Sequence, residues 1–151
     1  MLARAWGRPA FIAALGAILV GSGLWLTACG GIGFDDSRAG LSCVEDSSRC
    51  VGQRETTLKI LLADKERKWV KEPATPEAHA TGVRLFAFRS IKTELTCEEL
   101  AVGRREAQAA PAMMRNKGKG LSPAQVSRAS LLAAEVQKEL AAEMRRRRCR
   151  V

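Results

Sequence analysis

LSPAQVSRASLLAAEVQKELAAEM, residues 121–144, is the stretch that decides the fold. Its apolar residues recur every three or four positions, which places them on one face of an α-helix. These residues are Val126, Ala129, Ala133, Val136, Leu140 and Met144. Ser122 is expected to cap this helix, with Pro123 at the first helical position and Gln125 closing a capping box. We therefore expect one long helix that packs along most of its length.

The segment before it has the same kind of start. In LTCEEL, residues 95–100, Thr96 is the expected N-cap and Glu99 completes a second capping box. Pro111 is expected to end or kink this helix near Ala110, because proline has no N–H to donate. The glycines of NKGKG separate the two helices, so the sequence predicts an antiparallel helical hairpin.

Upstream of this hairpin the pattern predicts two more helices and a loop. A first helix is expected from about Glu55 to Val70, and residues 71–82 are expected to form a loop because they contain two prolines and a glycine. Residues 83–95 favour a helix over a strand, since the chain offers no partner strand. Their expected apolar face is Val83, Phe86, Ala87, Ile91 and Leu95. The fold class is therefore all-α, a small bundle of three to four helices over residues 55–151.

The chain begins like an exported protein. A short basic region with Arg4 and Arg8 precedes an apolar run at residues 11–26, and small residues follow. This run is shorter than the about 20 residues that span a bilayer. Residues 1–28 are therefore expected to be a signal peptide. An uncleaved signal anchor and ordinary cleavage into a secreted protein are the alternatives.

Leu26, Thr27, Ala28 and Cys29 follow the apolar run directly and resemble the lipobox of bacterial lipoproteins. The resemblance implies that the sulfur of Cys29 receives a diacylglyceryl group, that cleavage occurs before it, and that the protein is held on a membrane by its acyl chains. Gly30 stands where an aspartate would often mark retention in the inner membrane. The resemblance therefore favours the periplasmic leaflet of the outer membrane in the cell envelope.

Residues 29–54 are expected to form a lipidated, glycine-rich tether, flexible up to Gly40, together with a segment that contains Cys43 and Cys50. An even number of further cysteines in an exported chain predicts two disulfides. The short loop favours Cys43–Cys50, which leaves Cys97–Cys149, although helix lengths leave a mismatch of ~9 Å unless the chain end folds back. A zinc site is the competing interpretation, but six residues between Cys43 and Cys50 exceed the usual spacing.

Few residues suggest catalysis. His79 is the single histidine, and we expect it to be exposed and idle in the proline-rich loop. No nucleophile motif surrounds a serine, no HEXXH pattern occurs, and no cofactor or metal ligand is predicted. The row Glu135, Glu139 and Glu143 is expected to be a solvated helix face.

The C-terminus, MRRRRCRV, is the most distinctive remaining feature of a chain with a net charge of +9. More guanidinium groups gather there than helix-end stabilisation requires, and guanidinium pairs bidentately with phosphate or carboxylate. The candidate anion-binding residues are Arg145, Arg146, Arg147, Arg148 and Arg150. A merely solvated basic tail is the alternative, and an exported location argues against nucleic acid as partner.

Two functions follow from these features. The first is a small non-enzymatic envelope lipoprotein, anchored through Cys29, whose basic surface contacts anionic lipid, cell wall or another protein. The alternative is a lipid-anchored enzyme or enzyme accessory that acts on cell wall or lipid. Its expected signature is a concave cluster that includes Glu98, Glu99, Glu106 or His79.

Overall fold

The computed structural model describes residues 36–150, and this part contains helices and connecting segments but no strand. The elements are α1 (Asp36–Ser42), α2 (Ser48–Ala63), the 3₁₀-helix η1 (Lys68–Lys71), α3 (Pro76–Thr81), α4 (Val83–Ser90), α5 (Cys97–Lys117) and α6 (Pro123–Arg146). The all-α prediction is confirmed. The described part has six α-helices where three to four were expected, because α1 and α3 fall in segments that were assigned to tether and loop. The signal peptide and Cys29 lie outside the described residues.

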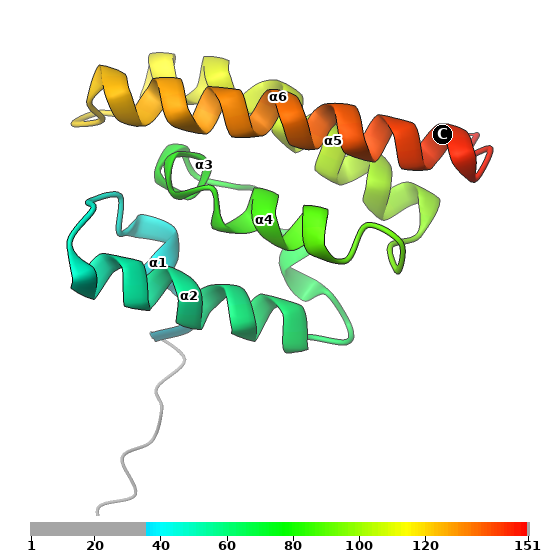
Figure 1. Ribbon diagram of the computed structural model, residues 1–151, viewed down its shortest axis with the longest axis horizontal. Helices are drawn as coiled ribbons and strands as arrows, with labels where there is room; N and C mark the ends of the chain where they lie inside the picture. Colours follow the sequence, from blue (N-terminus) through cyan, green and yellow to red (C-terminus); the bar gives the residue numbers. More distant parts are fainter. Residues whose placement is uncertain (1–35, 151) are drawn as a thin grey trace, which may run out of the picture. The chain divides into compact units, whose positions relative to one another are not determined.

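The two long helices form the predicted antiparallel hairpin, the upper layer in Figure 1. Both capping boxes are present: the Thr96 hydroxyl accepts from the Glu99 N–H at 3.2 Å, and Ser122 accepts from Gln125 at 3.2 Å. The predicted apolar stripe of α6 is buried from Ala129 to Met144, with Val126 partly buried. Local signals therefore placed the starts of both helices and the inner face of α6 correctly.

Of the two effects expected of Pro111, an end of the helix is wrong, because α5 continues through it to Lys117. Ala110 and Met114, on either side of this turn, are fully buried where α5 packs on α6. A proline inside a helix removes one backbone hydrogen bond. Here the packing of the following turn against α6 outweighs that loss.

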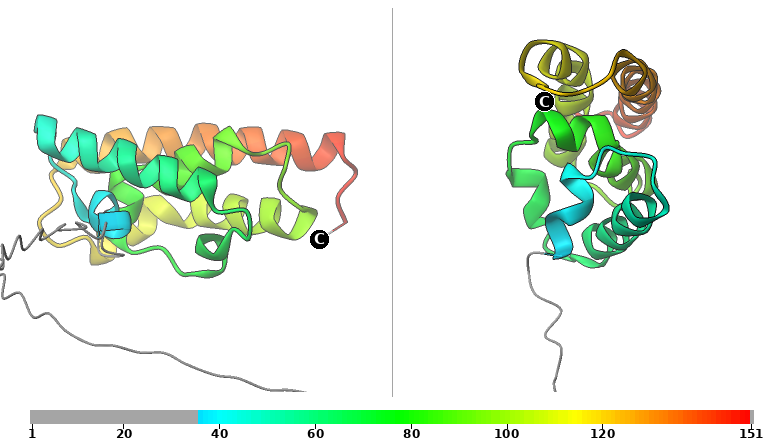
Figure 2. Two further views of the ribbon diagram at one scale, coloured as in Figure 1. Left: turned by 90° about the horizontal axis from the view of Figure 1, so that it is seen from below. Right: turned by 90° about the vertical axis from the view of Figure 1, so that its left-hand side faces the viewer.

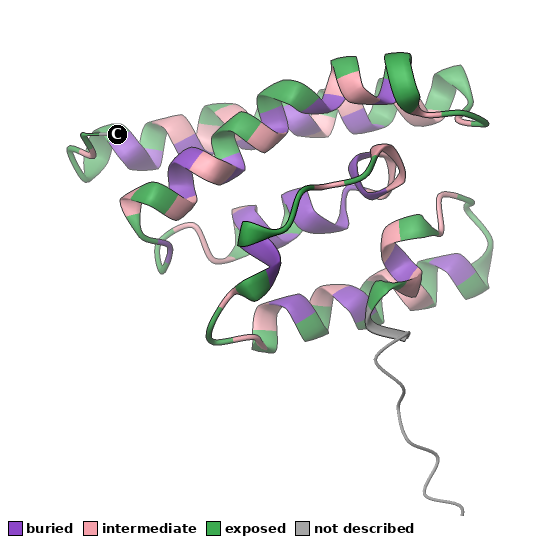
Figure 3. Cartoon of the chain, turned by 180° about the vertical axis from the view of Figure 1, so that it is seen from behind, coloured by how far each residue is buried: buried purple, intermediate pink, exposed green. Residues whose placement is uncertain are grey.

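Helix α4 lies in the middle of the bundle, between α2 on one side and the α5–α6 hairpin on the other (Figure 1). The predicted helix is present, but its buried face differs: Leu85 and Phe88 are fully buried, whereas Phe86 is 43% exposed. Because α4 is covered on two sides, its buried face is wider than a single stripe. Figure 3 shows this, with buried residues along most of α4.

The tether that was expected to be flexible up to Gly40 is helical from Asp36, where α1 begins, and the segment with Cys43 and Cys50 includes the first turn of α2. Helix α2 begins at Ser48, seven positions before the predicted Glu55, with Ser47 as its N-cap. Gly40 is buried where α1 crosses α2, and a Cβ there would meet the Gln53 carbonyl oxygen at 2.5 Å. Glycine thus allows a close helix crossing here rather than a flexible tether.

The expected loop at 71–82 contains a helix, α3. Thr75 caps it by accepting from the Ala78 N–H at 3.1 Å, Pro76 takes the first helical position, and Gly82 ends it at φ 72°. Proline and glycine interrupt a helix in its interior but favour its two ends. The same residues that predicted a loop therefore delimit a short helix.

Both expected cysteine pairs lie at disulfide distance, with Cα–Cα separations of 5.3 Å for Cys43–Cys50 and 5.5 Å for Cys97–Cys149. The second pair depends on a reversal of the chain after α6, at Arg148, whose φ is 56°. The left view of Figure 2 shows the C-terminal segment turning from the end of α6 towards the start of α5. This reversal, together with a longer α5, removes the length mismatch. No helix between residues 36 and 150 is long and apolar enough to cross a membrane.

Candidate functional site

Residues 145–150, which we call the C-terminal tip, form a closed turn. The Arg147 N–H donates to the Glu143 carbonyl at 3.0 Å, and the Cys149 N–H donates to the Met144 carbonyl at 2.9 Å. The Cys97–Cys149 pair ties the turn to the start of α5. The arginines therefore stand on a pinned turn and not on a frayed helix end.

Two arginines of the tip contact the protein itself. Arg146 donates two hydrogen bonds to the Glu143 carboxylate, at 2.9 and 2.5 Å, and Arg147 donates to the Leu95 carbonyl. The hydrogen bond from Arg146 lowers the pKa of Glu143, which is buried at 6% exposure. The expectation of a solvated glutamate row is thus wrong for Glu143, since it anchors the tip.

The other three arginines are available to a ligand. Arg145, Arg148 and Arg150 are exposed, and none of them forms an ion pair with another described residue. The preceding glutamate of α6, Glu139, already has a cationic partner: a hydrogen bond from Lys92 at 2.5 Å lowers its pKa. The tip therefore presents unpaired positive charge.

A second polar cluster lies inside the bundle, around Arg84 of α4. Its guanidinium binds the Glu106 carboxylate through two hydrogen bonds of 2.8 and 2.5 Å. It also donates to the carbonyls of Trp69 and Glu72, at 2.7 and 2.9 Å, and lies 5.5 Å from the Trp69 ring centroid. These bonds join α4, α5 and the segment around η1, which is a structural role.

Sequence reasoning missed Arg84 altogether. A charged residue is exposed by default, and VRLFAFRS gives no sign that Arg84 differs from Arg89. Its partner Glu106 lies on another helix. The one available signal is the position of Arg84 between Val83 and Leu85 on a segment with buried residues on two sides.

His79 of α3 belongs to the same region, and its predicted exposure is wrong: it is 3% exposed, because α3 packs on α5 and α6. Its Nδ1 atom is buried, and none of the described residues forms a hydrogen bond with it. Burial lowers the pKa of His79, while the nearby Glu106 carboxylate acts in the opposite direction. The side chain is therefore held in its neutral form.

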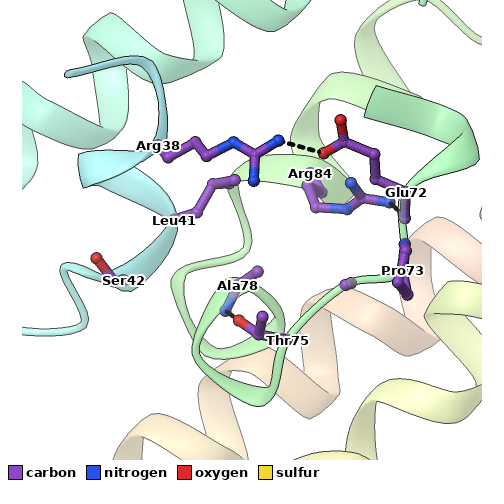
Figure 4. A pocket seen from close by; sticks show the side chains of 9 residues that line it. Arg38, Leu41, Ser42, Glu72, Pro73, Thr75, Ala78 and Arg84 are labelled. Carbon is purple, nitrogen blue, oxygen red and sulfur yellow. Dashed lines mark hydrogen bonds and ion pairs between the residues drawn. The ribbon is translucent and has the colours of Figure 1, made fainter. Parts of the chain in front are cut away.

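Hollows flank this cluster on the surface. One, of ≈ 230 Å³, lies beside the exposed Arg38–Glu72 ion pair and reaches Arg84 (Figure 4). A larger one, of ≈ 450 Å³, is bounded by the segment after η1, by α3 and by α5, and both His79 and Glu106 line it. Two residues of the expected enzymatic signature, His79 and Glu106, meet at this larger hollow.

The remaining signature residues do not join them. Glu98 is exposed, and Glu99 pairs with Arg67 at 2.8 Å. Burial alone would raise the pKa of Glu99, but hydrogen bonds from Arg67 and Thr96 outweigh it and lower the pKa. These two glutamates serve the start of α5 rather than a catalytic centre.

No protein-family model matches the chain, and no curated protein or solved structure matches it either. Function must therefore be argued from the geometry. In the part of the chain that the structure describes, no group of three or more His, Cys, Asp or Glu side chains could hold a metal ion.

Proposed function

We propose that the chain is a small, non-enzymatic lipoprotein of the bacterial cell envelope. Acyl chains on Cys29 hold it on the membrane, with the periplasmic leaflet of the outer membrane favoured, and the C-terminal tip contacts an anionic envelope component. The observation that carries the proposal is a set of three exposed arginines at the C-terminal tip that form no ion pair with another described residue, next to the Cys97–Cys149 pair. Phosphate and carboxylate are the groups such a set recognises.

Pinning matters because binding costs less when the contact groups are already ordered. A frayed basic tail would lose conformational freedom on contact with an anion. Here Arg146, Arg147 and the Cys97–Cys149 pair hold the backbone up to Cys149, so Arg145 and Arg148 are already positioned and Arg150 directly follows the tied residue. This supports an anion-binding tip over a solvated tail.

The anchor is tested by the intact mass of the protein from a bacterial membrane fraction, measured without reducing agent. We expect a species that begins at Cys29, carries added acyl mass and is four hydrogens lighter than the reduced chain. The Cys29→Ser variant serves as the control and should lack the acyl mass. An unacylated wild-type species would overturn the lipoprotein proposal.

The tip is tested by changing only its three unpaired arginines, in the variant Arg145→Gln, Arg148→Gln and Arg150→Gln. The protein, held in zwitterionic nanodiscs, is mixed with anionic vesicles or with isolated cell wall and sedimented at two salt concentrations. We expect salt-sensitive co-sedimentation of the wild type and its loss in the variant. Co-sedimentation with the vesicles would identify anionic lipid as the partner, and co-sedimentation with the cell wall would identify the wall.

A matched control removes the same charge elsewhere, with Arg104→Gln, Arg115→Gln and Lys119→Gln. These residues are exposed and form no ion pair within residues 36–150. The control should bind like the wild type. Equal loss in both variants would mean that net charge, and not the tip, governs binding.

The enzymatic alternative has one supporting observation, the hollow that His79 and Glu106 share. Both carboxylate oxygens of Glu106 accept hydrogen bonds from Arg84. A general base needs a carboxylate that can take a proton from substrate. Glu106 is engaged otherwise, so the binding function has the better support.

A further inference from the structure

The hollow that His79 lines, which we call the His79 hollow, has a volume of ≈ 450 Å³. This lies in the range of small-molecule sites, about 300–1,000 Å³. Its apolar wall comes from both sides: Val70 lies in η1 and Pro73 just after it, and Val102, Ala109 and Met113 stand on α5. An apolar body of modest size would therefore be covered on two sides.

The charged side chains around the hollow differ in whether they already have an ion-pair partner. Its two carboxylates are occupied, since Glu106 binds Arg84 and Glu72 binds Arg38 at 2.9 Å. Its two cations, Lys71 and Arg105, are exposed and form no ion pair with any described residue. The unpaired charge at the hollow is therefore positive.

His79 adds a buried polar atom without a partner. An unsatisfied buried donor or acceptor costs about 1–3 kcal/mol. The Nδ1 atom of His79 is such a group among the described residues. In the tautomer that carries its proton on Nδ1, this atom would donate to a carboxylate oxygen that reaches it.

From these three observations we propose that the His79 hollow binds a small carboxylate with an apolar body. The apolar body lies against Val102 and Met113, and the carboxylate lies between Arg105 and Lys71 within reach of His79. The proposal goes beyond the tip and the lipid anchor and depends on neither. Failure of one therefore leaves the other standing.

The test uses His79 itself as the probe, because it is the single histidine in the chain. The intact chain, held in lipid nanodiscs, is titrated with phenylacetate while the ¹H and ¹⁵N resonances of the imidazole are followed. We expect a saturable shift of these resonances. Phenylacetamide, which is neutral but has the same apolar body, should bind roughly tenfold more weakly, because it lacks the charge-assisted bonds.

Two variants locate the site. The variant Lys71→Gln with Arg105→Gln should weaken phenylacetate binding by roughly tenfold or more. The matched control, Lys65→Gln with Arg104→Gln, removes two exposed cations that do not line the hollow and should bind like the wild type. The unliganded imidazole resonances report whether each variant is folded.

Any of three results would overturn the proposal. One is that the imidazole resonances do not shift at any concentration of phenylacetate up to its solubility limit. Another is that phenylacetate binds the Lys71/Arg105 variant and the wild type with equal affinity. Equal binding of phenylacetamide and phenylacetate would also contradict it, since an apolar contact without the carboxylate would then explain the shift.

Discussion

Arg84 and Glu106 form an ion pair whose side chains are 3% and 7% exposed. Removal of one partner from a buried pair leaves an uncompensated charge and costs about 3–5 kcal/mol. We expect Arg84→Met and Glu106→Leu each to lower the free energy of unfolding by this amount in urea. The double variant should lose clearly less than the sum, because neither charge then remains buried alone.

The control for this pair is an exposed one. Arg38 and Glu72 lie 2.9 Å apart, but both are largely exposed, and such pairs contribute about 1 kcal/mol or less. Glu72→Gln should therefore change stability little, since its backbone carbonyl still accepts from Arg84. Similar costs at Glu106 and Glu72 would contradict the structural role of the buried pair.

Because His79 is buried, we expect the stability of the protein to depend on pH. Burial lowers its pKa in the folded protein below the ordinary 6.5, against the effect of Glu106 and with that of Arg84. The unfolded chain therefore takes up the proton first, and stability is lost as the pH falls through 6.5. We expect the free energy of unfolding, measured between pH 7 and pH 5, to decrease in the wild type.

The His79→Gln variant should lose this dependence, because the chain has no other histidine. The glutamates with a lowered pKa act in a separate window, since their contribution is lost only as the pH falls below their ordinary 4.5. A wild type whose stability is flat from pH 7 to pH 5 would show that His79 is not held neutral.

At the scale of the element, substitutions at two glycines within helices distinguish the effect of helix propensity from the effect of side-chain packing. A Cβ at Gly52 of α2 would meet nothing within 4 Å, whereas a Cβ at Gly103 of α5 would lie 2.6 Å from the Phe88 ring. Gly52→Ala should raise stability by up to about 1 kcal/mol. Gly103→Ala should lower it by about 1–3 kcal/mol through overpacking.

Denaturant midpoints of the two variants decide this, and each serves as the control for the other. The substitution is chemically the same at both positions and differs only in what the new methyl group meets. A gain of stability in both variants would mean that helix propensity outweighs the approach of α5 to Phe88.

The elements themselves differ in how far sequence can predict them. Long helices such as α5 and α6 carry caps and a stripe of apolar residues within one segment. Helices as short as α1 and α3 are marginal alone and depend on tertiary packing. Their sequence therefore looks like tether and loop until α2 and α5 are present to pack against.

At the scale of the whole molecule, the two cysteine pairs close loops of very different length. Their sequence separations are 7 for Cys43–Cys50 and 52 for Cys97–Cys149. In the chain-entropy model the longer loop contributes about 4 kcal/mol and the shorter about 2.5 kcal/mol. We expect Cys97→Ser with Cys149→Ser to cost more stability in urea than Cys43→Ser with Cys50→Ser.

The same two variants also test the regions at the two ends of α6 independently. The Cys43–Cys50 loop contacts the start of α6, where the Gln125 side chain donates to the Val44 carbonyl at 2.9 Å. The C-terminal tip lies at the other end of that helix, ~35 Å away at 1.5 Å per residue. Anion binding by the tip should therefore weaken in the Cys97/Cys149 variant and persist in the Cys43/Cys50 variant.

By itself the sequence determined the all-α class, the two capped long helices and the apolar face of α6. Each of these depends on residues within a few positions of one another, so local spacing carries the information. The cysteine pairing was narrowed by loop length, but the reversal at Arg148 that permits it is not a local pattern.

Only the tertiary structure decided which polar residues are buried and which arginines stay unpaired. Arg84 meets Glu106, and His79 is enclosed, because α4, α3 and α5 converge from distant parts of the chain. At the tip, Arg147 finds the Leu95 carbonyl across the α5–α6 hairpin. The environment of a charge depends on what the fold brings beside it, and that is set by contacts between segments far apart in sequence.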